Sequence, residues 1–296
     1  MFDGLPGVLF NGKEGRLPHV DGPPWPVLAM GASGSMERIG ELLLDRASPR
    51  GPAKPFPIVL VHGMWGGSWC WENYLGAAAG AGWDAWALNL RGHHGSRPVA
   101  NLGEVRVADY VQDVLDCLRV LGEVVLVGHS MGGLIAQKVA EVGGVRAAVF
   151  LTSAAPWGIP MLRWPVLRRV ARYLRPMFGN AAFLATRADA DSLLLNRLSP
   201  ERQAEVYARL VPESGRAARE LAFGLIQVDE NRVECPMLVV GAQWDRITPP
   251  SVQRRIAAKY DAEYLEIAGH AHMLIVEEGW EQPFKEILKW LEVAEA

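Results

Sequence analysis

The stretch Val124-Val125-Leu126-Val127-Gly128-His129-Ser130-Met131-Gly132-Gly133 decides the fold of this 296-residue chain. Its first four residues predict a strand that is buried on both faces, because a short apolar run bounded by glycine is typical of such strands. The next five residues match the G-x-S-x-G pattern, a sharp turn from a strand into a helix that exposes a serine hydroxyl. Apolar residues then recur at helical spacing: Leu134, Ile135, Val139 and Val142. The motif therefore stands between a predicted strand and a predicted helix, which is the context it requires.

Composition and charge limit the class of protein. Half of the residues are hydrophobic, so a chain of this length can bury a large core. The net charge of −3 gives no reason to expect a nucleic-acid partner. The three scattered cysteines, Cys70, Cys117 and Cys235, fit neither a disulfide framework nor a metal site. No apolar run reaches the roughly 18 residues of a membrane span, and the N-terminus lacks a signal-peptide pattern. We therefore expect a soluble, cytoplasmic protein without a metal.

Strands and helices alternate along most of the chain. Strands are predicted over 36–45, 58–61, 85–90, 124–127, 147–151, 237–240 and 264–267. Helices are predicted over 71–81, 107–121, 251–259 and 280–293. This alternation predicts an α/β fold with a mostly parallel, twisted sheet that is covered by helices on both faces.

Two segments depart from the alternation. Residues 1–35 are rich in glycine and proline and predict an extended arm, whose apolar residues suggest packing on another surface, such as a neighbouring subunit of a homo-oligomer. Residues 157–230 show helical patterns without a strand and predict a helical cap. The core then consists of 36–156 and 231–296. Insertions of this kind often cover the carboxyl edge of the sheet, where α/β proteins bind ligands.

The chemistry of a serine nucleophile indicates which other groups to seek. A serine hydroxyl needs a base within hydrogen-bond reach and an acid that orients the base. In folds with this motif the chain order is nucleophile, acid, histidine. Only His270 and His272 follow Ser130, so one of them is the predicted base. Asp245 is the predicted acid, because it stands in the loop after the predicted strand 237–240.

Attack on an ester carbonyl creates an oxyanion that needs two backbone N–H donors. Met131, directly after the nucleophile, is predicted to supply one of them. The loop His62-Gly63-Met64-Trp65-Gly66-Gly67 follows the predicted strand 58–61, and the N–H of Met64 is the predicted second donor. Each such donor lowers the reaction barrier by roughly 3 kcal/mol.

Taken together, these features resemble the α/β-hydrolase superfamily over about residues 55–155 and 232–292. The motifs that carry the resemblance are His62-Gly63, Arg91-Gly92-His93, Gly128 to Gly133, Gly241 with Asp245, and the terminal histidine loop. In relatives the catalytic histidine usually stands five residues before a glutamate. His272 stands five residues before Glu277, whereas His270 stands seven before it. The resemblance therefore implies that His272 is the base, and the reverse assignment stays open.

The loop from His62 to Trp71 is also similar to that of small-molecule esterases, including the plant methylesterase and hydroxynitrile lyase branch. Two features separate the chain from relatives. The loop after 85–90 begins with Asn89 and holds two histidines, where relatives commonly have aspartate and one histidine. The nucleophile is serine, which argues against the haloalkane dehalogenase and epoxide hydrolase activities that use aspartate.

The predicted cap opens with a basic amphipathic segment, residues 161–178, that holds five arginines and no acid: Arg163, Arg168, Arg169, Arg172 and Arg175. Its simplest interpretation is a cap helix with a solvated face. Alternatively, the basic face steers anionic substrates or docks on acidic lipid surfaces. Tryptophans in the cap and near the catalytic loops predict an apolar substrate pocket formed by Trp65, Trp69, Trp157, Trp164 and Trp244.

The sequence thus predicts a cofactor-free serine hydrolase that cleaves an apolar carboxylic ester of a small molecule through an acyl-enzyme. Hydrolysis of amides, thioesters, lactones or C–C bonds would use the same residues, as would lyase or perhydrolase chemistry. A hypothesis from another class is a ligand receptor that keeps the triad with little turnover. The fold alone does not decide between them, so the conclusion depends on the site.

Overall fold

The computed structural model describes residues 9–10, 13–14, 34–161 and 169–294. The chain divides into two compact units, Met1–Ala32 and Ser33–Ala296. In the first unit, strand β1 (Leu9–Phe10) pairs antiparallel with strand β2 (Lys13–Glu14). The role of residues 1–35 as an arm that packs on a neighbouring subunit stays a prediction. The second unit carries the other named elements.

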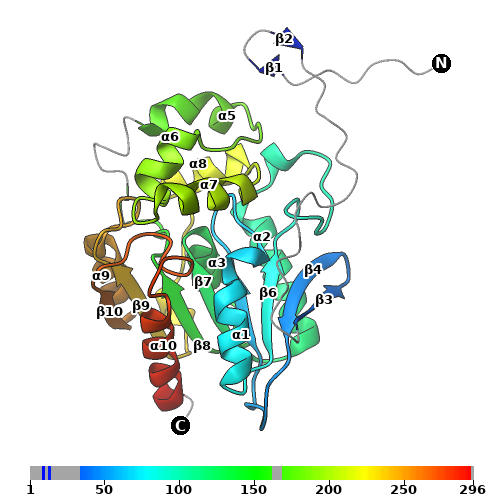
Figure 1. The fold of residues 1–296 in the computed structure, drawn as a ribbon, viewed down its shortest axis with the longest axis vertical. Helices are drawn as coiled ribbons and strands as arrows, with labels where there is room; N and C mark the ends of the chain where they lie inside the picture. The colour runs from blue at the N-terminus through cyan, green and yellow to red at the C-terminus, as the bar shows by residue number, and fades with distance from the viewer. Residues whose placement is uncertain (1–8, 11–12, 15–33, 162–168, 295–296) are drawn as a thin grey trace, which may run out of the picture. The chain divides into compact units, whose positions relative to one another are not determined.

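An eight-stranded sheet forms the centre of the second unit, in the order β10-β9-β8-β7-β5-β6-β4-β3 (Figure 1). Six of its strands run parallel: β5 (Ile58–Val61), β6 (Ala85–Asn89), β7 (Val124–His129), β8 (Val145–Leu151), β9 (Met237–Ala242) and β10 (Glu263–Ile267). Each coincides with a predicted strand to within two residues at either end. The predicted mostly parallel sheet is therefore confirmed.

The edge of the sheet beyond β6 differs from the prediction of one strand over 36–45. The chain instead forms an antiparallel hairpin of β3 (Gly34–Ile39) and β4 (Leu42–Ala47). Gly40 adopts a φ of 58°, which allows a two-residue turn with Glu41. Apolar residues on both sides of this turn conceal it in the sequence pattern.

The two faces of the sheet are covered by different helices. Along β5, Val59 and Val61 belong to one core cluster, whereas Ile58 and Leu60 belong to the other, because successive side chains of a strand point to opposite faces. The first cluster includes residues of α2 (Val107–Leu121), α3 (Met131–Ala140) and α9 (Pro250–Tyr260). The second includes residues of α1 (Glu72–Gly80) and α10 (Glu281–Ala294). These helices match the predicted ones, and α1 is preceded by a short 3₁₀ turn, Ser68–Trp71.

The chain between β8 and β9 is helical where it is described, and we call residues 157–230 the helical insertion. Its main elements are α5 (Leu174–Phe178), α6 (Arg187–Asp189), a π-helical turn (Ala190–Leu194), α7 (Pro200–Arg209) and α8 (Gly215–Ala222). Figure 1 shows these green to yellow helices beyond the end of the sheet at which α3 begins. Of the predicted basic helix 161–178, residues 162–168 lie outside the described part. Residues 169–178 are helical throughout, with a 3₁₀ turn (Ala171–Tyr173) directly before α5. That 157–230 is a cap domain in its own right stays a prediction.

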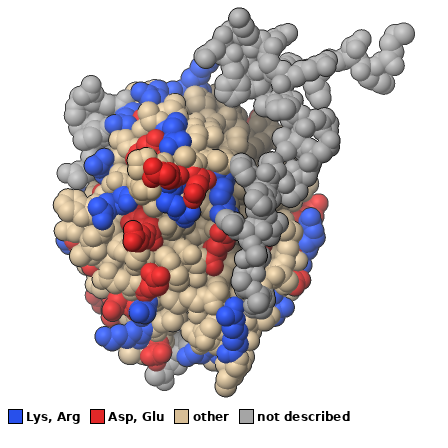
Figure 2. All heavy atoms as spheres, in the orientation of Figure 1, with Lys and Arg blue, Asp and Glu red and all other residues tan. Residues whose placement is uncertain are grey.

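Within the described ranges, no helix is both long and apolar enough to cross a membrane. On the face that Figure 2 presents, acidic and basic side chains are interspersed, and no large area of one sign is visible. This mixture agrees with the small net charge of the chain.

Candidate active site

Ser130 stands where β7 turns into α3, in a backbone conformation that only glycine adopts without cost. Its φ is 53° and its ψ is −117°. Such conformations persist when the surroundings enforce them, and they cluster at functional sites. Here the N–H of Ser130 donates to the carbonyl of Leu151 at 3.0 Å, and its own carbonyl accepts from Ala154 at 2.9 Å. The neighbouring strand and its loop therefore hold the serine in the turn.

Two glycines leave the room that this turn needs. A Cβ atom on Gly128 would lie 2.1 Å from the carbonyl oxygen of Gly132, and one on Gly132 would lie 2.2 Å from that of Val61. Both distances are far below van der Waals contact, and both neighbours are backbone atoms. The spacing of glycines in the motif is thus a consequence of how closely α3 approaches β7 and β5.

The three residues predicted as nucleophile, base and acid come together at the carboxyl ends of β7, β10 and β9. The Oγ of Ser130 lies 3.0 Å from Nε2 of His272, and Nδ1 of the same ring lies 2.8 Å from Oδ2 of Asp245. The side chains of His272 and Asp245 are buried. A carboxylate at Nδ1 selects the tautomer in which that nitrogen carries the proton, so that Nε2 is free to accept from the serine hydroxyl.

Asp245 is held by its own loop as well as by the histidine. The N–H groups of Ile247 and Thr248 donate to its Oδ1 at 2.8 and 2.9 Å. Burial acts to raise the pKa of this carboxyl, but the charge of His272 and the hydrogen bonds from His272 and Thr248 outweigh it and hold the pKa below its usual value. The carboxylate is therefore ionised at neutral pH and can stabilise an imidazolium.

The other downstream histidine has a different partner. Nδ1 of His270 lies 3.1 Å from Oε2 of Glu277, which also accepts from the N–H of Ala271 at 2.9 Å. His270 is buried, and among the described residues its side chain forms no hydrogen bond with Ser130 or Asp245. Of the two histidines, the geometry joins His272 to the other two residues and leaves His270 to support the loop.

The loop after β5 approaches the serine closely. A Cβ on Gly63 would lie 2.8 Å from Cβ of Ser130, and Trp65 adopts a φ of 63°. The N–H groups of Met64 and Met131 donate to no acceptor in the part of the chain that the structure describes. Two free donors beside a nucleophile are what an oxyanion requires.

His62 anchors this loop, a role that the sequence motif does not reveal. The N–H of Leu90 donates to its Nε2 at 3.2 Å, and Nδ1–H donates to the carbonyl of Gly63 at 2.8 Å. Burial, reinforced by neighbouring histidines, lowers the pKa of His62 well below its usual value. The ring is therefore neutral, which agrees with one nitrogen accepting while the other donates.

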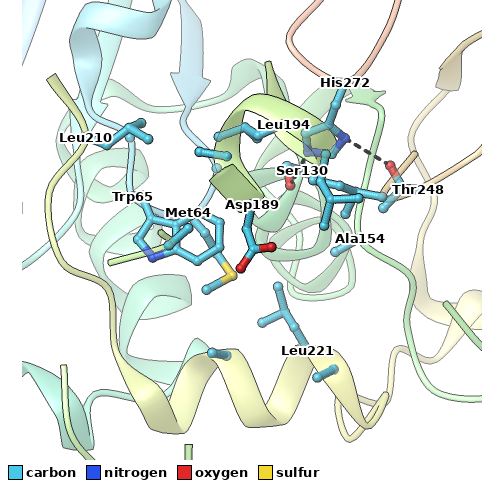
Figure 3. A pocket seen from close by; sticks show the side chains of 18 of the residues that line it. Met64, Trp65, Ser130, Ala154, Asp189, Leu194, Leu210, Leu221, Thr248 and His272 are labelled. Carbon is cyan, nitrogen blue, oxygen red and sulfur yellow. Dashed lines mark hydrogen bonds between the residues drawn. The ribbon is translucent and has the colours of Figure 1, made fainter. Parts of the chain in front are cut away.

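A largely apolar cavity of about 160 Å³ lies beside Ser130 and His272. The core contributes residues such as Met64 and Trp65, and the helical insertion contributes Leu194, Leu210 and Leu221 among others (Figure 3). The site therefore has a polar floor formed by the sheet loops and apolar walls formed by both regions.

Of the five tryptophans predicted to line the pocket, only Trp65 is among the described lining residues. Trp69 is buried in the core and donates its indole N–H to Nε2 of His94 at 3.3 Å. Trp157 and Trp244 are 62% and 54% exposed and lie outside the cavity. Trp157 opens the predicted cap and Trp244 directly precedes Asp245, but both rings are largely exposed to solvent, which corrects the prediction. Trp164 lies outside the described residues.

Three polar residues of the helical insertion line the cavity, although the sequence analysis does not predict them as pocket residues: Arg169, Tyr173 and Asp189. The charged and phenolic partners of Asp189 stand 16 to 20 residues earlier, so no local pattern indicates these contacts. Among the described residues, no group of three or more His, Cys, Asp or Glu side chains is arranged to hold a metal ion.

Comparison with known proteins places this geometry in context. The carbendazim hydrolyzing esterase of a Nocardioides species is 34% identical over 103 residues, which are 33% of this chain and 42% of that protein. This match thus spans about two fifths of the length of that relative. Methylesterase 3 of Arabidopsis thaliana is 24% identical over 73% of this chain and 89% of its own length. A thermophilic esterase from Thermogutta terrifontis has a similar structure, with a TM-score of 0.67 at 20% identity, covering 90% of this chain and 100% of that one.

A family model provides the broadest match. The model described as "Alpha/beta hydrolase family" matches residues 58–289, from the first parallel strand into the closing helix. That range contains the serine turn, the acid loop, the histidine loop and the helical insertion between them. Agreement of the strand order, the site geometry and this match leaves one conclusion: the chain belongs to the alpha/beta hydrolase family.

Proposed function

We propose that this protein is a serine esterase that hydrolyses apolar carboxylic esters of small molecules. The observation that carries the proposal is the unbroken chain of contacts from Ser130 Oγ through His272 to Asp245. Such a chain gives a hydroxyl the base that it lacks at neutral pH. Relatives named esterase and methylesterase support the same class of reaction. The reaction needs no cofactor, because nucleophile, base and oxyanion donors are all protein groups.

In the first half of the reaction, Ser130 Oγ attacks the ester carbonyl while its proton moves to Nε2 of His272. Ionised Asp245 stabilises the imidazolium that results. The N–H groups of Met64 and Met131 bind the oxyanion of the tetrahedral intermediate. The imidazolium then returns its proton to the leaving alcohol, and the acyl group stays on the serine.

In the second half, a water molecule takes the place of the alcohol. His272 removes a proton from this water, which attacks the acyl carbonyl at the same oxyanion donors. Collapse of the second tetrahedral intermediate breaks the bond to Ser130 Oγ, which recovers its proton from Nε2. The carboxylic acid leaves, and the enzyme is ready for another turn.

The cavity supports a small apolar group next to the scissile bond. Its volume of about 160 Å³ is close to that of an engineered apolar cavity of about 150 Å³ that binds benzene. A short acyl chain or a single ring matches this space. The helical insertion acts in this proposal as the cap that closes the cavity over the substrate.

Hydrolysis of a series of p-nitrophenyl esters, from acetate to palmitate, tests the proposal. We expect the highest kcat/KM for a short or medium acyl chain and loss of turnover in both Ser130→Ala and His272→Ala. His270→Ala is the matched control and should keep most of the activity, because that ring contacts Glu277 instead. Retention of turnover by Ser130→Ala would refute the mechanism. A wild-type acyl adduct that forms on Ser130 but turns over only once, as followed by mass spectrometry, would instead favour the receptor hypothesis.

A further inference from the structure

The cavity has a second polar wall, remote in sequence from the loops that carry Ser130 and His272. Arg169, Tyr173 and Asp189 line it, and all three belong to the helical insertion. Figure 3 shows the Asp189 carboxylate among the lining side chains, near Met64 and Leu221 in this view. The other lining residues of the insertion are apolar. A charged group in an otherwise apolar wall is unfavourable unless a partner compensates its charge.

The carboxylate of Asp189 is fully engaged by its own neighbours. Its Oδ1 accepts from Nη1 of Arg169 at 3.0 Å, and its Oδ2 accepts from Nη1 of Arg172 at 2.9 Å. The same Oδ2 also accepts from the hydroxyls of Tyr173 and Thr186 at 2.6 and 2.9 Å. The side chain of Asp189 is only 6% exposed. Asp189 therefore serves as an anchor and has little capacity left to bind a substrate.

Arg169, unlike Asp189, keeps hydrogen-bond donors that can bind a ligand. A guanidinium has five N–H donors, and in the described part of the chain only the Nη1 atom of Arg169 has a partner. Its side chain is 37% exposed, and the residue lines the cavity, whereas Arg172 does not. Two guanidinium groups against one carboxylate also leave an excess positive charge at this wall. The wall thus offers donors and positive charge, and a ligand must supply an acceptor.

We propose that Arg169 binds a carboxylate at the far end of the acyl group, so that the preferred substrates are hemiesters of dicarboxylic acids with a short apolar chain. A planar guanidinium that is held through Nη1 keeps its Nε and Nη2 donors for bidentate binding of a carboxylate. The apolar residues that line the same cavity accommodate the methylene groups, and the low polarity of the cavity strengthens the ionic contact. This inference rests on the proposed esterase function and adds a substrate class to it.

A pair of substrates of equal chain length tests the proposal: 4-nitrophenyl hexanoate and mono-4-nitrophenyl adipate. We expect wild-type protein to prefer the adipate hemiester in kcat/KM, mainly through a lower KM. In Arg169→Gln the ratio of the two kcat/KM values should shift toward hexanoate by about tenfold or more. Arg169→Lys keeps the charge but not the planar fork and should retain part of the preference.

Arg175→Gln is the matched control, because Arg175 belongs to the same basic segment, is exposed and does not line the cavity. Its substrate ratio should equal that of wild type. An unchanged ratio in Arg169→Gln, or an equal shift in Arg175→Gln, would overturn the proposal. So would a wild-type protein that hydrolyses hexanoate by way of Ser130 but shows no preference for the hemiester.

Binding to Ser130→Ala keeps this test independent of turnover. Calorimetry with monoethyl adipate and ethyl hexanoate should show tighter binding of the hemiester, and the difference should vanish when Arg169→Gln is added. If this binding preference holds while wild-type protein cleaves no ester, the esterase proposal fails and the binding site stands. If wild-type protein cleaves esters but shows no binding preference for the hemiester, the esterase proposal stands and the proposed carboxylate site fails.

Discussion

The carboxyl edge of the sheet and the helical insertion meet at one cavity, but different interactions stabilise each of the two regions. At the sheet edge, backbone hydrogen bonds and glycines without room for a Cβ fix Ser130 to its neighbours. The insertion consists of short helices, and several buried or charged side-chain contacts join it to the core. The difference suggests that the edge determines the reaction, whereas the insertion determines what reaches it.

A fully buried joining contact centres on Glu213, two residues before α8. Its carboxylate accepts from the hydroxyl of Tyr110 in α2, from Nε2 of His93 at 3.2 Å and from the N–H of Ser214 at 2.7 Å. Nδ1 of His93 donates to the carbonyl of Arg91 at 2.9 Å. Both ring nitrogens thus face acceptors, which is the arrangement of a protonated histidine paired with a buried carboxylate.

The largest effect on turnover is expected from two separate Asp→Asn variants, one at the sheet edge and one in the helical insertion. Asp245→Asn removes the charge that orients and stabilises His272, and we expect kcat to fall by about 10⁴-fold for every ester. Asp189→Asn weakens the contacts that anchor Arg169 and its neighbours in the insertion and leaves the triad intact, and we expect kcat/KM for the adipate hemiester to fall by about tenfold. Steady-state kinetics on both substrates measure the contrast. Equal losses in the two variants would contradict the division of roles between the regions.

The next largest effect concerns stability rather than turnover. Glu213→Gln leaves His93 buried without its counter-charge, and loss of one partner of a buried pair costs about 3 kcal/mol of unfolding free energy. Urea unfolding measures this loss. Among the described residues, Glu213 and His93 form no hydrogen bond with Ser130, His272 or Asp245, so kcat at a temperature where the variant is folded should change far less than in Asp245→Asn.

The pH dependence of this loss follows from the two pKa shifts. Burial acts to lower the pKa of His93, but the charge and hydrogen bond of Glu213 raise it above its usual 6.5. This contribution to stability is complete below pH 6.5 and is lost as pH rises through the raised value. Burial acts to raise the pKa of Glu213, but the charge of His93 and the hydrogen bonds from His93, Tyr110 and Ser214 bring it below its usual 4.5, so its contribution is lost only as pH falls through the lowered value.

The difference in stability between wild type and Glu213→Gln should therefore be greatest between pH 4.5 and 6.5 and shrink on both sides. Urea unfolding of both proteins inside and outside this window checks the shape. A difference that is constant with pH would mean that the pair is neutral and that Glu213 acts through packing alone.

The same contrast explains what could be predicted from sequence. Buried parallel strands are short apolar runs, and the serine turn has a fixed pattern of glycines, so β5, β7 and the positions of Ser130 and Asp245 follow from local residues. His272 required the resemblance to relatives, because spacing alone left His270 open. All of these features depend on neighbours within a few residues or on the order of strands.

The insertion depends on contacts that local patterns do not encode. Glu213 stands 120 residues after His93, and the sequence around either residue does not predict that they pair. Trp157 is predicted to line the pocket as part of the cap, and Trp244 because it is near a catalytic loop. The direction of a side chain in a turn, however, depends on backbone angles that composition does not specify. Composition likewise does not specify the hairpin at Gly40, because its turn depends on one positive φ.

The smallest effect on stability should come from an exposed ion pair that also joins the insertion to the core. Arg209 of α7 forms an ion pair with Glu72 of α1, and it stacks over the Trp69 ring at 4.5 Å. The two charged side chains are 33% and 48% exposed, so water screens their attraction and we expect Glu72→Gln to cost less than about 1 kcal/mol of unfolding free energy. Added salt should reduce even this loss, because it screens exposed charges and leaves buried ones largely unaffected. Urea unfolding of Glu72→Gln and Glu213→Gln at low and high salt gives the comparison directly. A loss in Glu72→Gln as large as that in Glu213→Gln would mean that surface charge, rather than the buried cluster, attaches the insertion to the core.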